Sequence, residues 1–536
     1  MLRLETQKAA TALMTDAPDV RHKSPIHPPL AIAGLFLLMF VLALLPLFAT
    51  PVLPLIDFYN HLARFYVLAH IGESPVLQAH YAAHWALLPD VGVDVVGVPL
   101  LSFLPPLAAG HVIAVLLMAN LYAGVLYFHR RLTGRHSLLM AVLLLPLLYS
   151  YIFNWGFANF LMGLGLAFWA AGWWLSHRTR TVTVLIGSSI WSLLIFFSHG
   201  VAFLLYGILV ASLEVGFFLG APARSPALLV RRLGLVAVQA VLPVIYFLSW
   251  KFGIAAGGEI STLANNTPPP FFPRLGRAFA YHLRTILRVE ESPSRLLDTA
   301  TFVLQAAILC FLVCTKRLTL APAARFLVPL ALLLALLPLP TLFGVGYIAD
   351  RVPLFAALCL IAALTPGARS WSGVSRALAV LLVLMVGGRL IAIGAGWSGY
   401  DERFREYRSI ASKLPPGGTA QIVMVGNGRH ETNVPRCEMY GPLLVALYGQ
   451  AAPLFADEKQ QPLAMTGRLR QAVGEGRPKP VDDPMRQDYD GLITRALDSG
   501  FDSVLVCNAG LLGGPYPQGI EVVARTGQFA LLRKAR

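Results

Sequence analysis

The sequence predicts an α-helical polytopic membrane protein that ends in a small α/β domain outside the membrane. Hydrophobic residues make up 56% of the 536 residues and charged residues only 13%, a balance that soluble domains do not reach. The apolar residues gather in runs long enough to cross a bilayer. An ordinary polar composition returns only in the tail, 397–536, where short helical and strand patterns alternate.

The membrane part extends over 29–396. The polar start, 1–28, contains no targeting segment and is expected to be disordered and cytoplasmic. The first apolar run is too long for the core of a signal peptide, so it predicts a retained span. About eleven spans of roughly 17 to 25 residues are predicted. They lie at 29–53, 98–128, 137–153, 156–176, 181–198, 200–219, 233–252, 298–314, 323–343, 353–365 and 375–396.

Basic residues mark one side of the predicted bundle. They are Arg130, Arg131, Arg135, Arg178, Arg180, Arg224, Arg231, Arg232, Lys316, Arg317, Arg369 and Arg376. Because Lys and Arg collect on cytoplasmic loops, these ends and the amino terminus are predicted to be cytoplasmic. Much of the formal net charge of +15 is therefore orientation signal, and no nucleic acid is expected as a partner. The segments 54–97 and 253–297 then lie outside, as does the tail.

The tail reads as a compact domain. Its predicted elements are a helix at 402–413, a strand at 420–426, helices at 439–449 and 489–499, a strand at 502–507 and a closing hairpin around TGQF. This alternation is typical of a small α/β fold. Cys437 and Cys507 can form a disulfide if the tail is outside the cytoplasm.

The stretch PLIDFYNHLARFYVLAH follows the first span and carries Asp57, His61 and Arg64 on one helical face. The opposite, apolar face consists of Phe58, Leu62, Phe65 and Ala69. We expect a helix in the outer interface, with its apolar face in lipid and its polar face towards a cavity. The alternative is an ordinary interfacial helix whose Asp57 carboxylate caps its own amino terminus.

Other polar residues fall at the same outer end of the predicted spans. They are Asn154, Trp155, Asn159, His199, Asp350 and Arg351. An Asp or Arg at the centre of a membrane helix costs roughly 2.5–3.5 kcal/mol on insertion scales. Their gathering on one membrane face therefore predicts a substrate cavity.

The second outer segment carries a basic stripe at intervals of three and four. It consists of Arg274, Arg277, Tyr281, Arg284 and Arg288. One interpretation is an amphipathic helix held by anionic lipid headgroups. The other is a phosphate clamp, because Arg donors in a partly dry cleft suit phosphoryl oxygens.

Two further groups are weaker candidates. His80 with His84 and Asp90 with Asp94 have a spacing that metal ligands can adopt, but Pro89 interrupts the segment and favours a solvated loop. His430, in the loop GNGRHETN, is a candidate to face the cavity from the tail.

The chain resembles the GT-C superfamily of membrane glycosyltransferases. The resemblance is carried by IDFYNHLAR, WGFANFLMGLGL, SHGVAF, ADRVPLFAAL and PLFADEKQQPL, in this order along the chain. It implies a bacterial inner-membrane enzyme that moves a sugar from a polyprenyl-phosphate donor to an outer glycan or lipid acceptor, with inversion. It also implies that Asp57 is the catalytic base. Many relatives have two acids in this motif, whereas Phe58 and Tyr59 follow here, so a divalent metal is possible but not expected.

The chemistry fits the residues. Glycosyl transfer needs a base for the acceptor hydroxyl and a cation for the departing phosphate. Asp57 can be the base, with His61 orienting it or sharing its proton. Phosphate binding is expected from Arg351, Arg64 and the arginines of the stripe, and Trp155 can stack on a sugar ring. Alternative functions are a transporter of lipid-linked glycans or small molecules, and a non-catalytic receptor whose tail binds a ligand.

Overall fold

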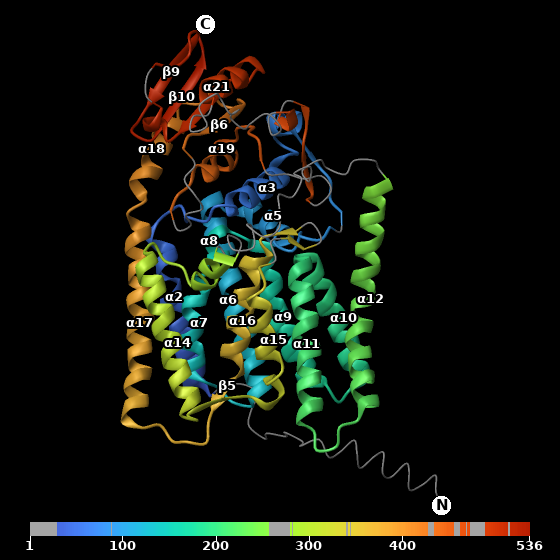
Figure 1. Ribbon diagram of the computed structural model, residues 1–536. Helices are drawn as coiled ribbons and strands as arrows, with labels where there is room; N and C mark the ends of the chain where they lie inside the picture. Colours follow the sequence, from blue (N-terminus) through green and yellow to red (C-terminus); the bar gives the residue numbers. More distant parts are fainter. Residues whose placement is uncertain are drawn as a thin grey trace, which may run out of the picture.

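The chain builds a bundle of long helices with a smaller sheet-containing body at one end, as the computed structural model in Figure 1 shows. The structure describes residues 29–535 except 87, 257–278, 281, 339–340, 343–344, 427–433, 455–460, 468, 472–487 and 513–514. The predicted Arg274, Arg277, Tyr281 and His430 lie outside the described residues.

Within the described residues, nine helices are long and apolar enough to cross a membrane. They are α2 (Leu30–Leu44) with its extension η1 (Leu45–Ala49), α6 (Pro106–Thr133), α7 (Leu138–Leu148) with α8 (Tyr151–Trp155), α9 (Ala158–His177), α10 (Thr181–Ser198), α11 (Gly200–Gly220), α12 (Pro226–Ala256), α14 (Arg295–Cys314) and α17 (Gly373–Ser398). The predicted polytopic helical fold is confirmed.

The two remaining predicted spans are shorter helices of the same bundle. The run at 323–343 contains η3 (Pro322–Ala324) and α15 (Leu327–Ala335), and the run at 353–365 belongs to α16 (Ile348–Ala363). Because α16 begins five residues earlier than predicted, Asp350 and Arg351 lie in its first turn.

The predicted span at 98–128 is in fact two helices. α5 (Asp94–Phe103) lies above the bundle beside α3 (Phe58–His70), and only α6 descends through it. The break falls at Leu104, which is extended, with φ −117° and ψ 147°. The residue before a proline is pushed away from the helical region, and here Pro105 and Pro106 follow. An apolar run alone does not reveal such a corner.

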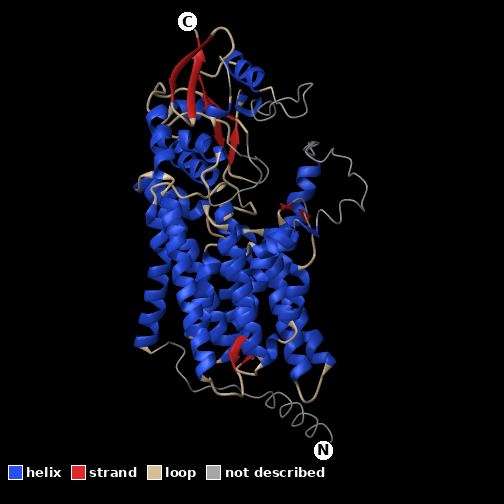
Figure 2. Ribbon diagram, turned by 60° about the vertical axis from the view of Figure 1, so that its left-hand side comes forward, coloured by secondary structure: helices blue, strands red, loops and turns tan. Residues whose placement is uncertain are grey.

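The tail has the predicted α/β organisation. α18 (Asp401–Ala411) follows α17 almost without a linker. A four-stranded sheet has the order β6-β8-β10-β9, in which β6 (Ala420–Met424) is parallel to β8 (Ser503–Cys507) and the hairpin of β9 (Ile520–Arg525) and β10 (Phe529–Lys534) is antiparallel. The helices α19 (Tyr440–Tyr448) and α21 (Tyr489–Asp498) pack against strands of this sheet. Figure 2 shows the strands of the tail in red at the end of the molecule that carries the C-terminus. The predicted elements of the tail are therefore confirmed.

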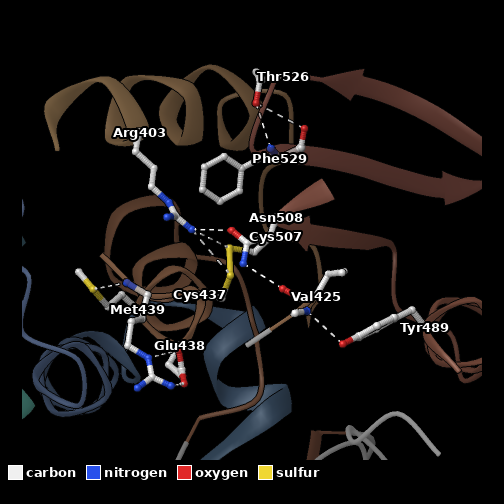
Figure 3. Close-up of a disulfide and its surroundings, with 12 residues drawn as sticks. Arg403, Val425, Cys437, Glu438, Met439, Tyr489, Cys507, Asn508, Thr526 and Phe529 are labelled. Atoms are coloured by element: carbon white, nitrogen blue, oxygen red, sulfur yellow. Dashed lines mark hydrogen bonds and ion pairs between the residues drawn. A yellow bond between two sulfur atoms is a disulfide. The ribbon is translucent and has the colours of Figure 1, made fainter. Parts of the chain in front are cut away.

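A disulfide joins Cys437 in the short turn η4 (Cys437–Met439) to Cys507 at the end of β8. The possible pairing of these cysteines is thus realised. Figure 3 shows Arg403 of α18 reaching towards the bridge, where its Nη2 donates to Asn508 Oδ1 at 2.8 Å. The bridge fixes η4 to the sheet, and η4 faces the membrane bundle.

The tail also pairs with the first outer segment. After α4 (Pro75–His80), the strand β1 (Tyr81–Ala83) runs antiparallel to β7 (Leu463–Met465). The Tyr81 hydroxyl donates to the Ala452 carbonyl oxygen and accepts from the Ala452 amide. Val67 of α3 belongs to the same hydrophobic cluster as Val423 and Val445 of the tail. The tail therefore shares its core with the segment that carries Asp57.

The expectation that the apolar face of α3 lies in lipid is wrong. Phe58, Leu62 and Phe65 are buried in the protein, packed in the main hydrophobic cluster with the bundle helices. Both α5 and α19 pack against α3. Helical periodicity shows that one face is apolar, but it does not show whether lipid or protein covers it.

The remaining short strands lie at opposite ends of the bundle. β3 (Thr341–Leu342) and β4 (Val345–Gly346) form a hairpin just before α16. β2 (Leu318–Leu320) pairs with β5 (Leu364–Pro366) at the end far from the tail. The basic residues that the sequence assigned to the cytoplasm cluster at this far end, in the turns that connect the helices and in the helix ends next to them.

This arrangement predicts the orientation of the chain. A reporter that is active only in the periplasm should be active when fused after residue 400 and silent when fused after residue 134. A reporter active only in the cytoplasm is the control and should give the opposite pattern, because the basic ends stay inside. The reverse result for both reporters would place the tail in the cytoplasm.

Candidate functional site

The predicted site residues meet where α3 lies between the bundle and the tail (Figure 1). The contributing segments are the start of α3, the turn before α5, the outer ends of α8 and α9, the α10–α11 junction, the first turn of α16 and η4. Most of the polar side chains that these segments contribute are buried, so their polar atoms need hydrogen-bond partners inside the protein.

Asp57 occupies the N-cap position of α3, but its side chain accepts no capping hydrogen bond from the backbone and is 29% exposed. Asn60 Nδ2 donates to its Oδ1 at 3.4 Å, and its backbone amide donates to the Trp155 carbonyl oxygen at 2.8 Å. The helix-cap interpretation therefore fails at its hydrogen bond, and the carboxylate stays partly exposed.

Gly156 makes this junction possible. Its φ of +83° is a left-handed conformation, and a Cβ atom at this position would lie 2.4 Å from the Phe58 amide nitrogen. Any other residue would be strained and would push α3 away from α8. The glycine in the motif WGFANF therefore helps to place Asp57.

His61 faces Asp57 with a defined tautomer. Arg64 Nη2 lies 3.0 Å from His61 Nδ1, and a guanidinium can only donate, so Nδ1 is an acceptor. The proton of the neutral ring is then on Nε2, which lies 3.6 Å from Asp57 Oδ2. This distance is slightly longer than a hydrogen bond, and catalytic contacts often tighten only when substrate binds.

Arg64 is held by Asp94 of α5. Both side chains are almost fully buried, and two hydrogen bonds join them, Nε to Oδ1 at 2.6 Å and Nη2 to Oδ2 at 2.8 Å. This bidentate geometry suits an arginine and a carboxylate. The structure thus gives Arg64 a partner of its own, and Asp94 is buried rather than part of a solvated loop. His84, in contrast, is exposed as expected.

The turn around Asp90 wraps the end of α10. The amides of Asp90, Val91 and Gly92 all donate to the Phe197 carbonyl oxygen, at 3.0, 2.9 and 3.1 Å. Asn159 holds the same turn, because its Nδ2 donates to the Asp90 carbonyl at 2.6 Å and its Oδ1 accepts from the Val93 amide at 2.8 Å. Asn159 is therefore a positioning residue for this turn.

Asp90 itself is strained and partly buried. Its φ is +90°, a conformation that costs a non-glycine residue about 1–3 kcal/mol. Desolvation of the carboxyl, only partly offset by the nearby charges of Arg64 and Arg351, raises the pKa of Asp90 to about 7. Such a group exchanges its proton near neutral pH.

Arg351 lies on the other side of the site. Its guanidinium carbon lies 4.7 Å from the ring centre of Phe157, and its Nη1 donates to the Gly346 carbonyl. The carboxylates that interact with its charge include those of Asp90, Asp350 and Asp57. The Thr285 hydroxyl donates to Asp350 Oδ1 at 3.2 Å, so the second outer segment also reaches this site.

His199 is neutral and borders the same group of residues. The Val201 amide donates to its Nδ1 at 3.1 Å, which places the proton of the ring on Nε2. The ring packs edge-on against Phe160, and Arg351 also lies over the face of Phe160. His199 and Arg351 therefore pack against the same ring, that of Phe160.

An aromatic cluster connects Arg351 with the tail. Trp155, Phe157 and Tyr347 have ring centres 5.3 to 5.9 Å apart. Arg351 lies over Phe157, and Arg436, which precedes η4, lies 5.7 Å from the ring centre of Trp155. The tail thus contributes a cation to the site, and its sequence contained no local signal for this role.

Asn154 links α8 to the end of the second outer segment. Its Nδ2 donates to Glu291 Oε2 at 3.1 Å, and Glu291 also accepts from Arg288 and forms an ion pair with it. The Arg288 guanidinium lies over the Tyr151 ring. Of the described arginines in the predicted basic stripe, Arg288 is therefore folded onto the bundle, whereas Arg284 is exposed.

A buried network of ion pairs and hydrogen bonds lies next to Glu291. Arg389 of α17 pairs with Asp298 of α14 at 2.8 Å, and Gln305 donates to Glu290 at 3.0 Å. The Ser292 amide donates to Asp298 Oδ1 at 2.9 Å. This network joins α17, which leads into the tail, to α14 and to the loop that contains Glu290 and Ser292. The sequence carries no local signal for this network, because Arg389 lies in an otherwise apolar run.

Several buried polar atoms of the site have no hydrogen-bond partner within the described part of the chain. They are Asp90 Oδ1, Asn154 Oδ1, Arg351 Nε and Arg436 Nη1. Similar atoms occur elsewhere in the described chain, for example at Arg317 and Arg495, so they do not by themselves mark a binding site. At the candidate site they are polar groups with hydrogen-bonding capacity that the protein leaves unused.

The described residues contain no group of three or more His, Cys, Asp or Glu side chains that could hold a metal ion. The pairing of Asp94 with Arg64 removes one of the carboxylates that the sequence had offered as a ligand. The expectation of a metal-independent reaction remains a prediction.

No family model matches the sequence, and no curated protein sequence matches it. Solved structures are similar over nearly the whole chain. ArnT from Cupriavidus metallidurans in the apo state shares 14% identity with a TM-score of 0.49, covering 94% of this chain and 97% of ArnT. For ArnT bound to undecaprenyl phosphate, the TM-score is 0.45 at the same identity and coverage.

Arabinofuranosyltransferase AftD from Mycobacteria shares 16% identity with a TM-score of 0.48. The match covers 95% of this chain but 40% of AftD, so this chain corresponds to less than half of that protein. At these TM-scores the similarities carry no argument about fold or activity. The function proposed below depends on the residues of this chain.

The buried pair leads to a test of the role of Arg64. Replacing it in Arg64→Met leaves Asp94 as an uncompensated buried charge, which should cost about 3–5 kcal/mol of stability. The double variant Arg64→Met/Asp94→Leu removes both charges and should recover most of the loss. Thermal unfolding of the purified protein in detergent measures both effects. A single variant that is as stable as wild type but binds undecaprenyl phosphate poorly would instead make Arg64 a phosphate ligand.

Proposed function

We propose that this protein is a GT-C-type glycosyltransferase of the bacterial inner membrane. It moves a sugar from a polyprenyl-phosphate donor to a hydroxyl group of an outer glycan or lipid. The observation that carries the proposal is a partly exposed Asp57 carboxylate that makes no capping hydrogen bond, at the same end of the bundle as the buried and unsatisfied atoms of Asp90 and Arg351. ArnT has been solved bound to undecaprenyl phosphate, a lipid of the class proposed here.

In this proposal Asp57 removes the proton of the acceptor hydroxyl. His61 Nε2–H faces the carboxylate and holds it in place, and Arg64 fixes the His61 tautomer. A well-placed general base typically contributes 10²- to 10⁴-fold to a rate. Direct attack by the activated hydroxyl on the anomeric carbon gives inversion.

Arg351 is the proposed partner of the donor phosphate. Its Nε is buried without a partner among the described residues, and a guanidinium suits phosphoryl oxygens. The aromatic cluster of Trp155, Phe157 and Tyr347 offers apolar ring faces beside it. Arg284, on the exposed outer segment, is left for lipid headgroups or for the entering donor. The lipid tail would remain in the bilayer against the outside of the bundle.

The disulfide supports the proposed location. Stable disulfides form in oxidising compartments such as the bacterial periplasm, and the Cys437–Cys507 bridge lies in the tail. A site at the same end of the bundle would meet its donor in the outer leaflet. Acceptors outside the cytoplasm could then approach from the side of the tail.

The central test is Asp57→Asn in purified protein supplied with undecaprenyl-phosphate-linked pentoses and hexoses. The variant keeps size and polarity but loses basicity, so transfer should fall by about 10²-fold or more while undecaprenyl phosphate still binds. Glu73→Gln is the matched control, because this carboxylate follows the same helix and its side chain is 84% exposed. It should transfer like wild type.

Other outcomes would redirect the proposal. Near wild-type transfer by Asp57→Asn would move the base to His61 or Asp90. Passage of the intact lipid across the bilayer without any transferred sugar would favour a transporter.

Arg351→Ala should behave differently from Asp57→Asn. It removes a phosphate partner and should weaken binding of undecaprenyl phosphate as well as transfer. Binding to protein in lipid nanodiscs measures the first effect and counted product the second. Unchanged binding would remove Arg351 from the phosphate site.

The proposal assigns the leaving charge to an arginine and uses no metal. Transfer should therefore persist when EDTA is present and should not rise when Mg²⁺ or Mn²⁺ is added. Loss of activity in EDTA that added metal restores would contradict this part of the proposal.

A further inference from the structure

Asp90 is a carboxyl group beside the proposed reacting centre that still lacks a role. One of its oxygens is buried and unsatisfied among the described residues, while the residue as a whole is only partly covered. The Asp90 side chain is therefore not fully enclosed by the protein.

The turn that carries Asp90 is held on every side. Phe197 accepts three of its amides and Asn159 binds it twice. Gly92 is required here, since a Cβ atom would lie 2.5 Å from the Ser198 hydroxyl oxygen. A non-glycine residue at φ +90° persists only where the surrounding structure enforces it, and such strain gathers at functional sites.

The charged and titratable groups that act on Asp90 come from three helices. They are His61 and Arg64 of α3, Asp94 of α5 and Arg351 of α16. Arg64 and Asp94 neutralise each other, and His61 is neutral because its Nδ1 accepts from Arg64. Arg351, whose charge also interacts with Asp350 and Asp57, is thus one of the cations that act on Asp90, and it is also the proposed phosphate ligand.

Resting on the function proposed above, we infer that Asp90 is a second catalytic residue, which gives its proton to the phosphate as the sugar departs. The acceptor O–H bond breaks and its proton moves to Asp57, while the acceptor oxygen bonds to the anomeric carbon. The bond from this carbon to the phosphate oxygen breaks, and its electron pair stays on that oxygen. This oxygen then takes the proton of Asp90.

The cycle closes without a further reactant. Asp57 loses its proton to water and Asp90 regains one from water, so the net reaction is sugar transfer alone. An ionised Asp90 would repel the phosphate beside Arg351, whereas the protonated form donates a hydrogen bond to it. Because the pKa of Asp90 is raised to about 7, the working form predominates below that pH and is lost above it.

The test is the pH dependence of the transfer rate at saturating donor. The donor is whichever member of the undecaprenyl-phosphate sugar panel the wild-type protein turns over. Wild type should slow about tenfold per pH unit above 7, as expected for loss of one proton. Asp90→Asn should be slower than wild type at pH 6 by about 10²-fold and should show no further fall between pH 7 and 9.

Asp90→Gly separates the carboxyl from the backbone strain. Glycine accepts φ +90° without cost, so this variant should fold at least as well as wild type and still lose the same rate at pH 6. An infrared difference spectrum of wild type minus Asp90→Asn should show a protonated carboxyl band that disappears as pH rises through 7. This readout does not depend on turnover.

The outcomes distinguish the inference from the function beneath it. If wild type transfers sugar, and Asp90→Asn and Asp90→Gly keep the wild-type rate and pH profile, the role of Asp90 is overturned while the function stands. If only the affinity for undecaprenyl phosphate changes with pH, Asp90 gates binding and is not the proton donor. If wild type transfers from no member of the panel, the proposed function falls and the inference falls with it.

Discussion

The enclosure of α3 between the membrane bundle and the tail is the constraint on which the candidate site depends. A helix in contact with water or headgroups can leave an arginine unpaired, but a helix surrounded by protein cannot, because an isolated buried charge costs several kcal/mol. Asp94 meets this need for Arg64 through two hydrogen bonds. The same Arg64 Nη2 that binds Asp94 also donates to His61 Nδ1 and so sets the tautomer of His61, which in turn faces Asp57. The need to pair a buried arginine thereby orients an imidazole beside Asp57.

The site belongs to neither part of the molecule alone. The bundle supplies Arg351 and the ring of Trp155, and the tail supplies Arg436, which covers that ring. The disulfide holds η4 next to Arg436 against the sheet. Arg389 and Asp298 join α17, which leads into the tail, to α14. Relative movement of the two parts would therefore separate residues of the candidate site.

The strained turn at Asp90 is likewise fixed by hydrogen bonds to groups on other helices. Its amides satisfy the carbonyl end of α10, and Asn159 satisfies the turn in return. Backbone groups are fully used here, whereas the Asp90 carboxyl is left with unused capacity. Evolved proteins tolerate strain and unsatisfied polar atoms mainly where function requires them. The contrast between a satisfied backbone and an unsatisfied side chain is what singles out this residue.

The sequence by itself determined the properties that depend on neighbouring residues. The lengths of apolar runs predicted the membrane helices, local turn signals predicted the elements of the tail, and helical spacing placed Asp57, His61 and Arg64 on one face. It did not determine which side chains meet across the fold. Arg64 pairs with Asp94, Asn159 holds the Asp90 turn, Arg436 covers Trp155, and protein rather than lipid covers the apolar face of α3. Each of these contacts joins segments that are remote in the chain. Only the packing of the tail onto the bundle brings them together, and no local pattern encodes that packing.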